Sequence, residues 1–224
     1  MPPLAAIGFA PRQTMRAILD SAEKPAAIAI VIAAMLSFSL RDLDIQGFAE
    51  VESALGLPTV LLLAPLVLAV MAFAGIVFYF VVSAAAAVIG RWMLGGSGTH
   101  RDVRLAVAWG LAPQVWALLY RLPVLLLWPD AVALLRGGRG KIAVGDLEIK
   151  PFFSPDVPLY QVIVIACLEL AFFAWYLTVG SQALGEAQGF SSLRGLANLL
   201  LTVVLPFVAL LVVIIAGFLA VWTV

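Results

Sequence analysis

The chain has 224 residues, of which 64% are hydrophobic and only 12% are charged. An average soluble domain carries about 25% charged residues, so this composition excludes an ordinary soluble protein and indicates a polytopic membrane protein within a lipid bilayer. Thirteen Lys and Arg balance thirteen Asp and Glu. No net field therefore attracts nucleic acid, and we expect no nucleic-acid partner.

Residues 1–24 precede the first apolar run and predict a cytoplasmic segment with one interfacial helix over 11–24. Pro11 stands at the first helical position, and Arg16 can pair with Asp20 one turn later. The apolar side chains of this helix share one face and are Met15, Ile18 and Leu19. We therefore expect the helix to lie along the inner membrane surface.

Five apolar runs predict membrane spans, because an ionisable group at the bilayer centre costs at least about 2.5 kcal/mol. A helix of about 20 apolar residues crosses the hydrocarbon layer. The predicted spans are about 25–40, 58–89, 105–128, 159–183 and 196–221. The first is short and needs Lys24 and Arg41 to extend to the interfaces, and the third holds Pro113 and Pro123 and should be kinked. The predicted fold is an all-α integral membrane protein, with residues 25–224 forming a bundle of five transmembrane helices.

Lys and Arg residues in the short loops predict the orientation. With the N-terminus inside, seven lie on the cytoplasmic side (Arg12, Arg16, Lys24, Arg91, Arg101, Arg104 and Arg194) and five on the other (Arg41, Arg136, Arg139, Lys141 and Lys150). The majority favours a cytoplasmic N-terminus and a C-terminus on the opposite side, although the basic loop after the third span argues the other way.

Two polar segments between the spans each leave two interpretations open. Residues 42–55 carry apolar residues on one side, as in an interfacial helix, but a solvated connecting loop fits equally well. Residues 142–144 and 147–149 are β-like runs around Gly145-Asp146, which is the pattern of a hairpin. An isolated hairpin is marginal in water, so a flexible loop fits this segment as well.

Signatures of enzymes and of metal sites are absent from the sequence. There is one histidine, His100, and one cysteine, Cys167, and there is no H-E-x-x-H, P-loop, G-x-S-x-G or Cys/His cluster. We therefore expect no catalytic residue, no cofactor and no metal ion, and a protein that is not an enzyme.

Arg121 and Glu169 are the exceptional residues, because an ionisable side chain inside a membrane span is by default a functional hypothesis. Each can neutralise the other if the third and fourth spans are neighbours. We favour a structural ion pair, and a proton or substrate relay is the functional alternative. Arg121 can also extend outward to the interface.

The loop before the third span is rich in glycine, which permits a tight turn on the cytoplasmic side. Thr99 can cap the following helix, whose first turn holds Asp102. Without a preceding strand and a following Lys-Ser/Thr, the Gly-Gly-x-Gly pattern is a poor phosphate-binding signal. The candidate loop-structuring or partner-binding residues here are Gly95, Gly96, Gly98, Thr99, Arg101, Arg104 and Pro113.

A second cytoplasmic turn follows the fourth span. Gly189 predicts a helix stop, and Ser191 or Ser192 predicts a new N-cap. Glu186 lies on the same predicted side as Arg101 and Arg104, so an ion pair between the two loops is the simpler hypothesis and a shared docking surface the functional one. The candidates in this turn are Glu186, Gly189, Ser191 and Arg194.

Three landmarks, in this order, resemble those of the Yip-one domain family, the Ypt-interacting-protein membrane proteins. They are Pro11-Arg-x-Thr-Met-Arg16, then Gly95-Gly-x-Gly-Thr-x-Arg101 with Pro113, then Trp175…Leu184…Gly189-Phe-Ser191 with Ala197. The resemblance implies five membrane helices, a cytosolic N-terminus and a C-terminus on the far side. Eukaryotic members are associated with Rab-type GTPases, vesicle traffic and membrane shaping. This chain lacks their long polar N-terminal region, which puts GTPase binding in doubt, and it is more similar to a prokaryotic member of a bacterial inner membrane.

Two functions remain open on the sequence. The first is a non-enzymatic scaffold for partner binding or membrane organisation, which uses the N-terminal helix and the loops 95–104 and 184–194. The second is a small transporter or channel subunit for an ion, lipid or small molecule, with Glu169 and Arg121 on its path. The scaffold is favoured because no inverted repeat is visible. Its partner would be an unknown protein or a second copy of the chain, since the small residues at 84–87 permit close helix approach.

Overall fold

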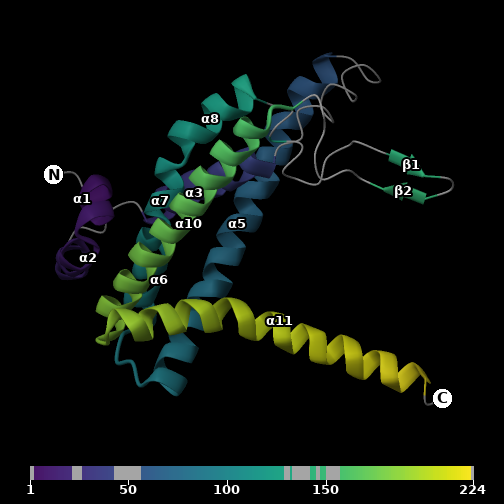
Figure 1. Ribbon diagram of the computed structural model, residues 1–224. Coiled ribbons are helices and arrows are strands. Elements are labelled where there is room, and N and C mark those ends of the chain that lie inside the picture. The colour runs from purple at the N-terminus through teal and green to yellow at the C-terminus, as the bar shows by residue number, and fades with distance from the viewer. Residues whose placement is uncertain are drawn as a thin grey trace. The chain divides into compact units, whose positions relative to one another are not determined.

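Long helices make up most of the described chain (Figure 1). The computed structural model describes residues 3–21, 27–42, 57–128, 132, 142–144, 147–149 and 157–222. The helices in these ranges are α1 (Pro3–Phe9), α2 (Pro11–Asp20), α3 (Ala27–Asp42), α5 (Leu57–Leu94), α6 (His100–Gly110), α7 (Ala112–Trp116), α8 (Leu118–Leu127), α10 (Leu159–Gln188) and α11 (Ser192–Trp222). The prediction that helices build the membrane part is confirmed.

Three of the described helical segments are long and apolar enough to cross a membrane, namely Pro65–Leu94, His100–Leu127 and Leu159–Gln188. Two shorter apolar helices are Ala27–Leu40 and Ser192–Pro206. Large apolar side chains such as Phe73, Leu126 and Leu170 are exposed on these helices, and such surfaces suit hydrocarbon rather than water. The protein is therefore an integral membrane protein, and the count of five spans stays a prediction.

Two short strands lie in the polar segment before α10. Strands β1 (Ile142–Val144) and β2 (Leu147–Ile149) pair antiparallel, with Ile142 opposite Ile149. The turn predicted at Gly145-Asp146 lies outside the described residues, as does the interfacial helix predicted after Asp42. That this segment forms an ordered unit resting on helices or on another chain stays a prediction.

The third predicted span consists of three helices rather than one kinked helix. Helix α6 ends at Gly110, where the N–H of Leu111 donates to Ala108 O at 3.1 Å, and α7 ends before Ala117, whose N–H donates to Pro113 O at 2.9 Å. Proline has no N–H to continue the helical ladder, so a break in this proline-containing stretch has a local cause. The helix boundaries fall in the stretch where the kink is predicted, and the kink itself stays a prediction.

The first of two compact units comprises Met1–Ile28, Val77–Ala112 and Tyr176–Val224. Within it α2 contacts α1 and α6, and Ile7 of α1, Met15 of α2 and Val103 of α6 are fully buried. The apolar face of α2, which we expected to face the bilayer surface, is thus covered by protein. Helix α1 was not predicted from the sequence.

Polar side chains and glycines join the long helices of this unit. The carbonyl oxygen of Ala86 in α5 accepts from Gln188 Nε2 at 3.1 Å and from Asn198 Nδ2 at 3.0 Å. A Cβ at Gly110 would lie 3.1 Å from the Cα of Gly180, so α6 and α10 pack almost backbone to backbone. Small residues allow such approach, and side-chain amides join helices where lipid removes the hydrophobic drive for association.

The second unit comprises Ala29–Ile76 and Pro113–Trp175. It contains most of α3, the first part of α5, α7, α8, β1, β2 and the first part of α10. Gly75 of α5 lies against the side chain of Met35 in α3, where a Cβ would collide with it. The buried polar residues of this unit include Ser37, Gln114 and Arg121.

Two glycines of the first unit give a matched test of helix packing. A Cβ at Gly195 would collide with the backbone oxygen of Ser181, whereas a Cβ at Gly180 would make ordinary contacts with the side chains of Leu199 at 3.4 Å and Tyr176 at 4.0 Å. We expect Gly195→Ala to lower the free energy of unfolding by about 1–3 kcal/mol. Gly180→Ala should be neutral or slightly stabilising, because alanine is the better helix former. Thermal unfolding in one detergent, followed by tryptophan fluorescence, measures both, and equal midpoints would contradict the packing.

Candidate functional site

Arg121 lies in α8 of the second unit and is 5% exposed. Its backbone N–H donates to Ala117 O at 2.9 Å, so its backbone belongs to the first turn of α8. Burial of an unpaired guanidinium in an apolar environment costs several kcal/mol. A buried Arg121 side chain therefore needs a nearby carboxylate that neutralises its charge.

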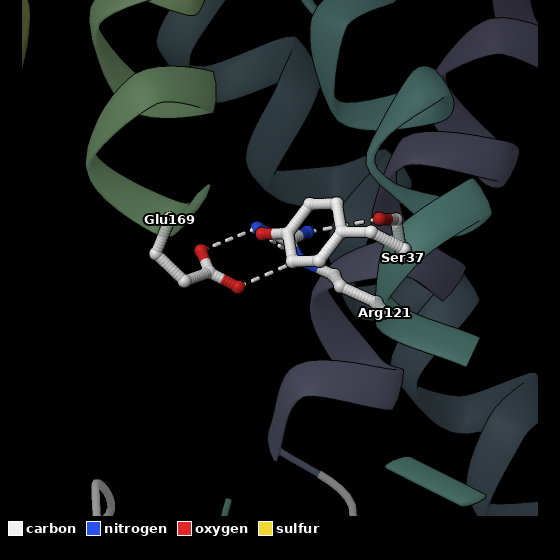
Figure 2. Close-up of polar contacts among 4 residues, drawn as sticks. Ser37, Arg121 and Glu169 are labelled. Atoms are coloured by element: carbon white, nitrogen blue, oxygen red, sulfur yellow. Dashed lines mark hydrogen bonds and ion pairs between the residues drawn. The ribbon is translucent and has the colours of Figure 1, made fainter. Parts of the chain in front are cut away.

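Glu169 of α10 is that partner, and the two side chains form a forked ion pair (Figure 2). Arg121 Nε donates to Glu169 Oε1 at 2.9 Å, and Nη2 donates to Oε2 at 2.7 Å. The remaining nitrogen, Nη1, donates to Ser37 Oγ of α3 at 2.9 Å. Bidentate arginine–carboxylate bonds fix direction as well as distance, so the pair joins three helices in a defined geometry.

Aromatic rings cover the guanidinium on the sides that Glu169 and Ser37 leave open. Its Cζ lies 5.6 Å from the ring centroid of Phe38 and 5.7 Å from that of Tyr120. Both rings offer their π-electrons to the cation, which adds to the stabilisation of a desolvated charge. The Glu169 side chain keeps 27% of its surface exposed. The arrangement holds a charge in place, and arginine does not give up its proton in proteins.

The predicted pairing of Arg121 with Glu169 is confirmed, while the contribution of Ser37 was missed. The only sequence signal for Ser37 is that it is a serine in a short apolar span. Ser39 gives the same signal but does not join the ion pair. Its hydroxyl donates instead to Met35 O at 2.9 Å within α3. No group of histidine, cysteine, aspartate and glutamate in the described ranges could hold a metal ion.

The first unit brings together the two predicted cytoplasmic loops. Gly95 ends α5 with φ +74°, a conformation that favours glycine, and Gly96 N–H donates to Gly90 O at 2.8 Å. Ser97 N–H donates to Gln188 O at 3.1 Å, at the end of α10. A Cβ at Gly98 would collide with the carbonyl oxygen of Ala187, so this glycine permits the contact between the loop and α10.

Thr99 begins α6 with the capping box that its spacing to Asp102 predicts. Its Oγ1 accepts from the Asp102 N–H at 3.2 Å, and its own N–H donates to Asp102 Oδ2 at 3.3 Å. The Thr99 hydroxyl also donates to Oδ2 at 2.6 Å. The Asp102 carboxylate therefore accepts its hydrogen bonds from Thr99, within the first turn of α6.

The turn after α10 is also as predicted. Gly189 has φ +73°, Phe190 N–H donates to Gly185 O at 2.9 Å, and Gly189 N–H donates to Glu186 O at 3.3 Å, which together make a Schellman motif. Ser191 Oγ accepts from Arg194 N–H at 3.4 Å and caps α11.

Glu186 pairs with two arginines of α2 and not with the loop arginines that we expected. Arg16 Nε donates to Glu186 Oε1 at 2.7 Å, and Arg12 Nε lies 3.6 Å from Oε2. Arg12 Nη2 also donates to the carbonyl oxygen of Phe190 at 2.7 Å. The hydrogen bond and the charge of Glu186 raise the pKa of the Arg16 guanidinium. The prediction that Glu186 pairs with Arg101 or Arg104 is therefore wrong.

Arg101, Arg104 and Arg194 are exposed and have no acidic partner within the described residues. Pro113 belongs to the second unit and is fully buried. We name the group formed by α2, residues 95–104 and residues 184–194 the clamp surface. These ranges contain Arg12 and Gln188, which sequence reasoning did not name as candidates because neither has a cap, glycine or charge-pairing signal of its own.

A substitution series tests whether the Arg121–Glu169 pair is structural. Arg121→Leu removes the cation that neutralises the Glu169 carboxylate and should lower the free energy of unfolding by about 2–4 kcal/mol, a moderate value for a buried pair because Glu169 is partly exposed. The double variant Arg121→Leu/Glu169→Leu removes both charges and should regain most of the loss. Detergent thermal unfolding measures all three proteins. A double variant no more stable than Arg121→Leu would contradict a purely structural pair.

Comparison with known proteins adds the family. A model of the Yip1 domain matches residues 5–217, a range that contains all three landmarks noted in the sequence. Searches of curated proteins and of solved structures find no match. The predicted resemblance is confirmed over nearly the whole chain, and the protein belongs to the Yip1 domain family of membrane proteins.

Proposed function

We propose that this protein is a non-enzymatic membrane scaffold that binds a protein partner through the clamp surface. The observation that carries the proposal is the convergence, within one unit, of three segments that are far apart in the sequence. The amino-terminal helix α2, the glycine loop before α6 and the turn after α10 are joined by Ser97, Arg12 and Arg16 through direct bonds to residues 186–190.

Two features of this surface suit a docking role. It is preorganised, because backbone caps and glycine turns fix the two loops before any partner arrives. It also presents exposed cations at Arg101, Arg104 and Arg194 that are not neutralised within the described residues. Exposed charges of one sign steer an acidic partner and set its orientation.

The intramembrane pair supports the scaffold over the transporter. A relay or path residue needs to exchange bonds with a substrate or with water, but all three guanidinium nitrogens of Arg121 donate within the pair and to Ser37. Such an arrangement suits a residue that holds helices together. A transporter stays the alternative that the experiment below distinguishes.

A copurification experiment with charge variants tests the scaffold. The tagged full chain is purified in mild detergent from its native membrane, and copurifying proteins are quantified by mass spectrometry. We expect Arg101→Glu to reduce the partner by about tenfold or more, as for a central interface residue. Gln161→Glu, at the other end of α10, adds the same type of charge away from the clamp surface and should leave the partner bound. Glu169→Gln should leave it bound as well.

If Gln161→Glu lost as much of the copurifying partner as Arg101→Glu, the amount of bound partner would depend on the charge of the protein and not on the clamp surface. Absence of any specific protein, together with loss of a transport activity in folded Glu169→Gln, would favour the transporter.

We propose further that five spans place the N-terminus in the cytoplasm and the C-terminus on the other side of a bacterial inner membrane. The helices α3, α5, α6 to α8, α10 and α11 supply the spans, and the excess of arginine on the clamp surface agrees with a cytoplasmic location.

Reporter fusions test this topology. A fluorescent protein fused to the N-terminus should be bright, and alkaline phosphatase, which folds only outside the cytoplasm, should be active at the C-terminus. Fusions of each reporter to the opposite end serve as controls. An inactive C-terminal phosphatase on a stably expressed chain would rule out an odd number of spans.

A further inference from the structure

A depression of about 210 Å³ lies in the first unit between the second half of α5 and the first turns of α6. Phe80, Ser83 and Ala84 line it from α5, and His100 and Arg104 line it from α6. One wall is therefore largely apolar, and the other carries a permanent cation and an imidazole. None of these residues takes part in the contacts that join the clamp surface.

Arg104 is the charged group of the depression. Its side chain is exposed, and its Cζ lies 5.9 Å from the ring centroid of Phe80, so the guanidinium is turned toward the apolar wall. Its carbonyl oxygen accepts a hydrogen bond from the Tyr79 hydroxyl at 2.9 Å, which fixes the separation of α5 and α6 at this point. The guanidinium has no acidic partner among the described residues.

The first turn of α6 adds further positive potential. Its N-terminal N–H groups carry the positive end of the helix dipole, and His100 is its first residue. The nearest carboxylate in this turn, that of Asp102, is bound by the Thr99 N–H and hydroxyl in the capping box. An anion between His100 and Arg104 would thus meet donors.

The apolar wall continues along α5. Phe80 is 43% exposed, Val77 on the preceding turn is 47% exposed, and the adjacent Val81 is 60% exposed. This helix segment is apolar enough to cross a membrane, so these side chains suit contact with hydrocarbon. A ligand that fits both walls has an anionic head and an apolar tail.

We propose that the depression binds the phosphate group of an anionic phospholipid, with Arg104 and His100 as its donors and the α5 wall beneath its acyl chain. Arginine suits this role because its planar fork matches phosphate oxygens. The same donors would accept free phosphate, but the exposed Phe80, Val77 and Val81 favour a lipid. His100 and Arg104 also belong to the clamp surface, but the lipid site does not rest on the scaffold function and would serve a transporter equally well.

Lipid retention tests the site. The full chain is placed in nanodiscs of equal parts phosphatidylglycerol and phosphatidylcholine, and native mass spectrometry counts the lipids that remain bound on release. Wild type should retain phosphatidylglycerol in preference to phosphatidylcholine. Arg104→Gln should retain about fivefold less, the effect of one cation near a lipid surface. Arg101→Gln is the matched control, because it removes the same charge from the same turn outside the depression, and it should retain the wild-type amount.

Two further arms separate the site from its alternatives. Ala84→Phe fills the depression without changing a charge and should lose retention as Arg104→Gln does. Inorganic phosphate is titrated into lipid-free protein and should not raise the thermal midpoint at concentrations where phosphatidylglycerol does. Midpoints within about 2 °C of wild type without lipid show that the variants are folded.

Equal losses in Arg101→Gln and Arg104→Gln would overturn the proposal in favour of diffuse attraction to anionic lipid. Full retention by a folded Ala84→Phe would overturn it too, because lipid would then bind elsewhere. Stabilisation by inorganic phosphate without retention of phosphatidylglycerol would replace the lipid with a soluble ligand.

Discussion

The carboxyl end of α10 is the constraint on which the first unit depends. The last carbonyl groups of a helix have no partner within it, and an unsatisfied group that is buried in the protein is costly. Here Gly185 O and Glu186 O are satisfied by the Schellman turn, and Gln188 O by the loop at Ser97. The side chain of Glu186 binds α2, and that of Gln188 binds α5. Ending one helix thus fixes three other segments.

Helices in lipid gain little from burying apolar surface against each other, so specific contacts decide their packing. In the second unit the specific contact is ionic, because Arg121 requires Glu169 and orders Ser37 on a third helix. In the first unit it is the doubly accepting carbonyl of Ala86, together with glycines that allow close backbones. The small residues after position 83 therefore serve an internal contact, at least at Ala86 and Ala87, which are buried.

Local signals predicted the local structure well. The Thr99 cap and the Gly189 stop follow from residues within one turn of each other, and both are present. The Arg121–Glu169 pair was predictable for a different reason, since two charges inside the membrane have few alternatives to each other. What the sequence could not supply was the identity of uncharged polar partners. Gln188 and Asn198 find Ala86 only because three helices have a particular rotation and depth.

The error at Glu186 has the same origin. Several arginines stand on its side of the predicted membrane, and charge alone does not choose among them. The position of α2 determines which arginines pair with Glu186. This helix packs against α6, where its apolar face is covered, and the packing brings Arg12 and Arg16 to the Glu186 carboxylate. Predicting the partner would have required α1, whose buried Ile7 belongs to the same packed core and which has no charge or cap signal of its own.

This allocation of charges also decides what the rest of the surface can do. If Glu186 had paired with Arg104, the depression beside the exposed face of α5 would be left without its unpaired arginine. Because α2 supplies its own arginines to the clamp, the two α6 arginines keep their charge available, one pointing into the depression by Phe80 and one outside it. A desolvated anion is bound far better by a cation that has no competing carboxylate. If the proposed lipid binds there, the amino-terminal helix contributes to its recognition without touching it, because α2 occupies the Glu186 carboxylate.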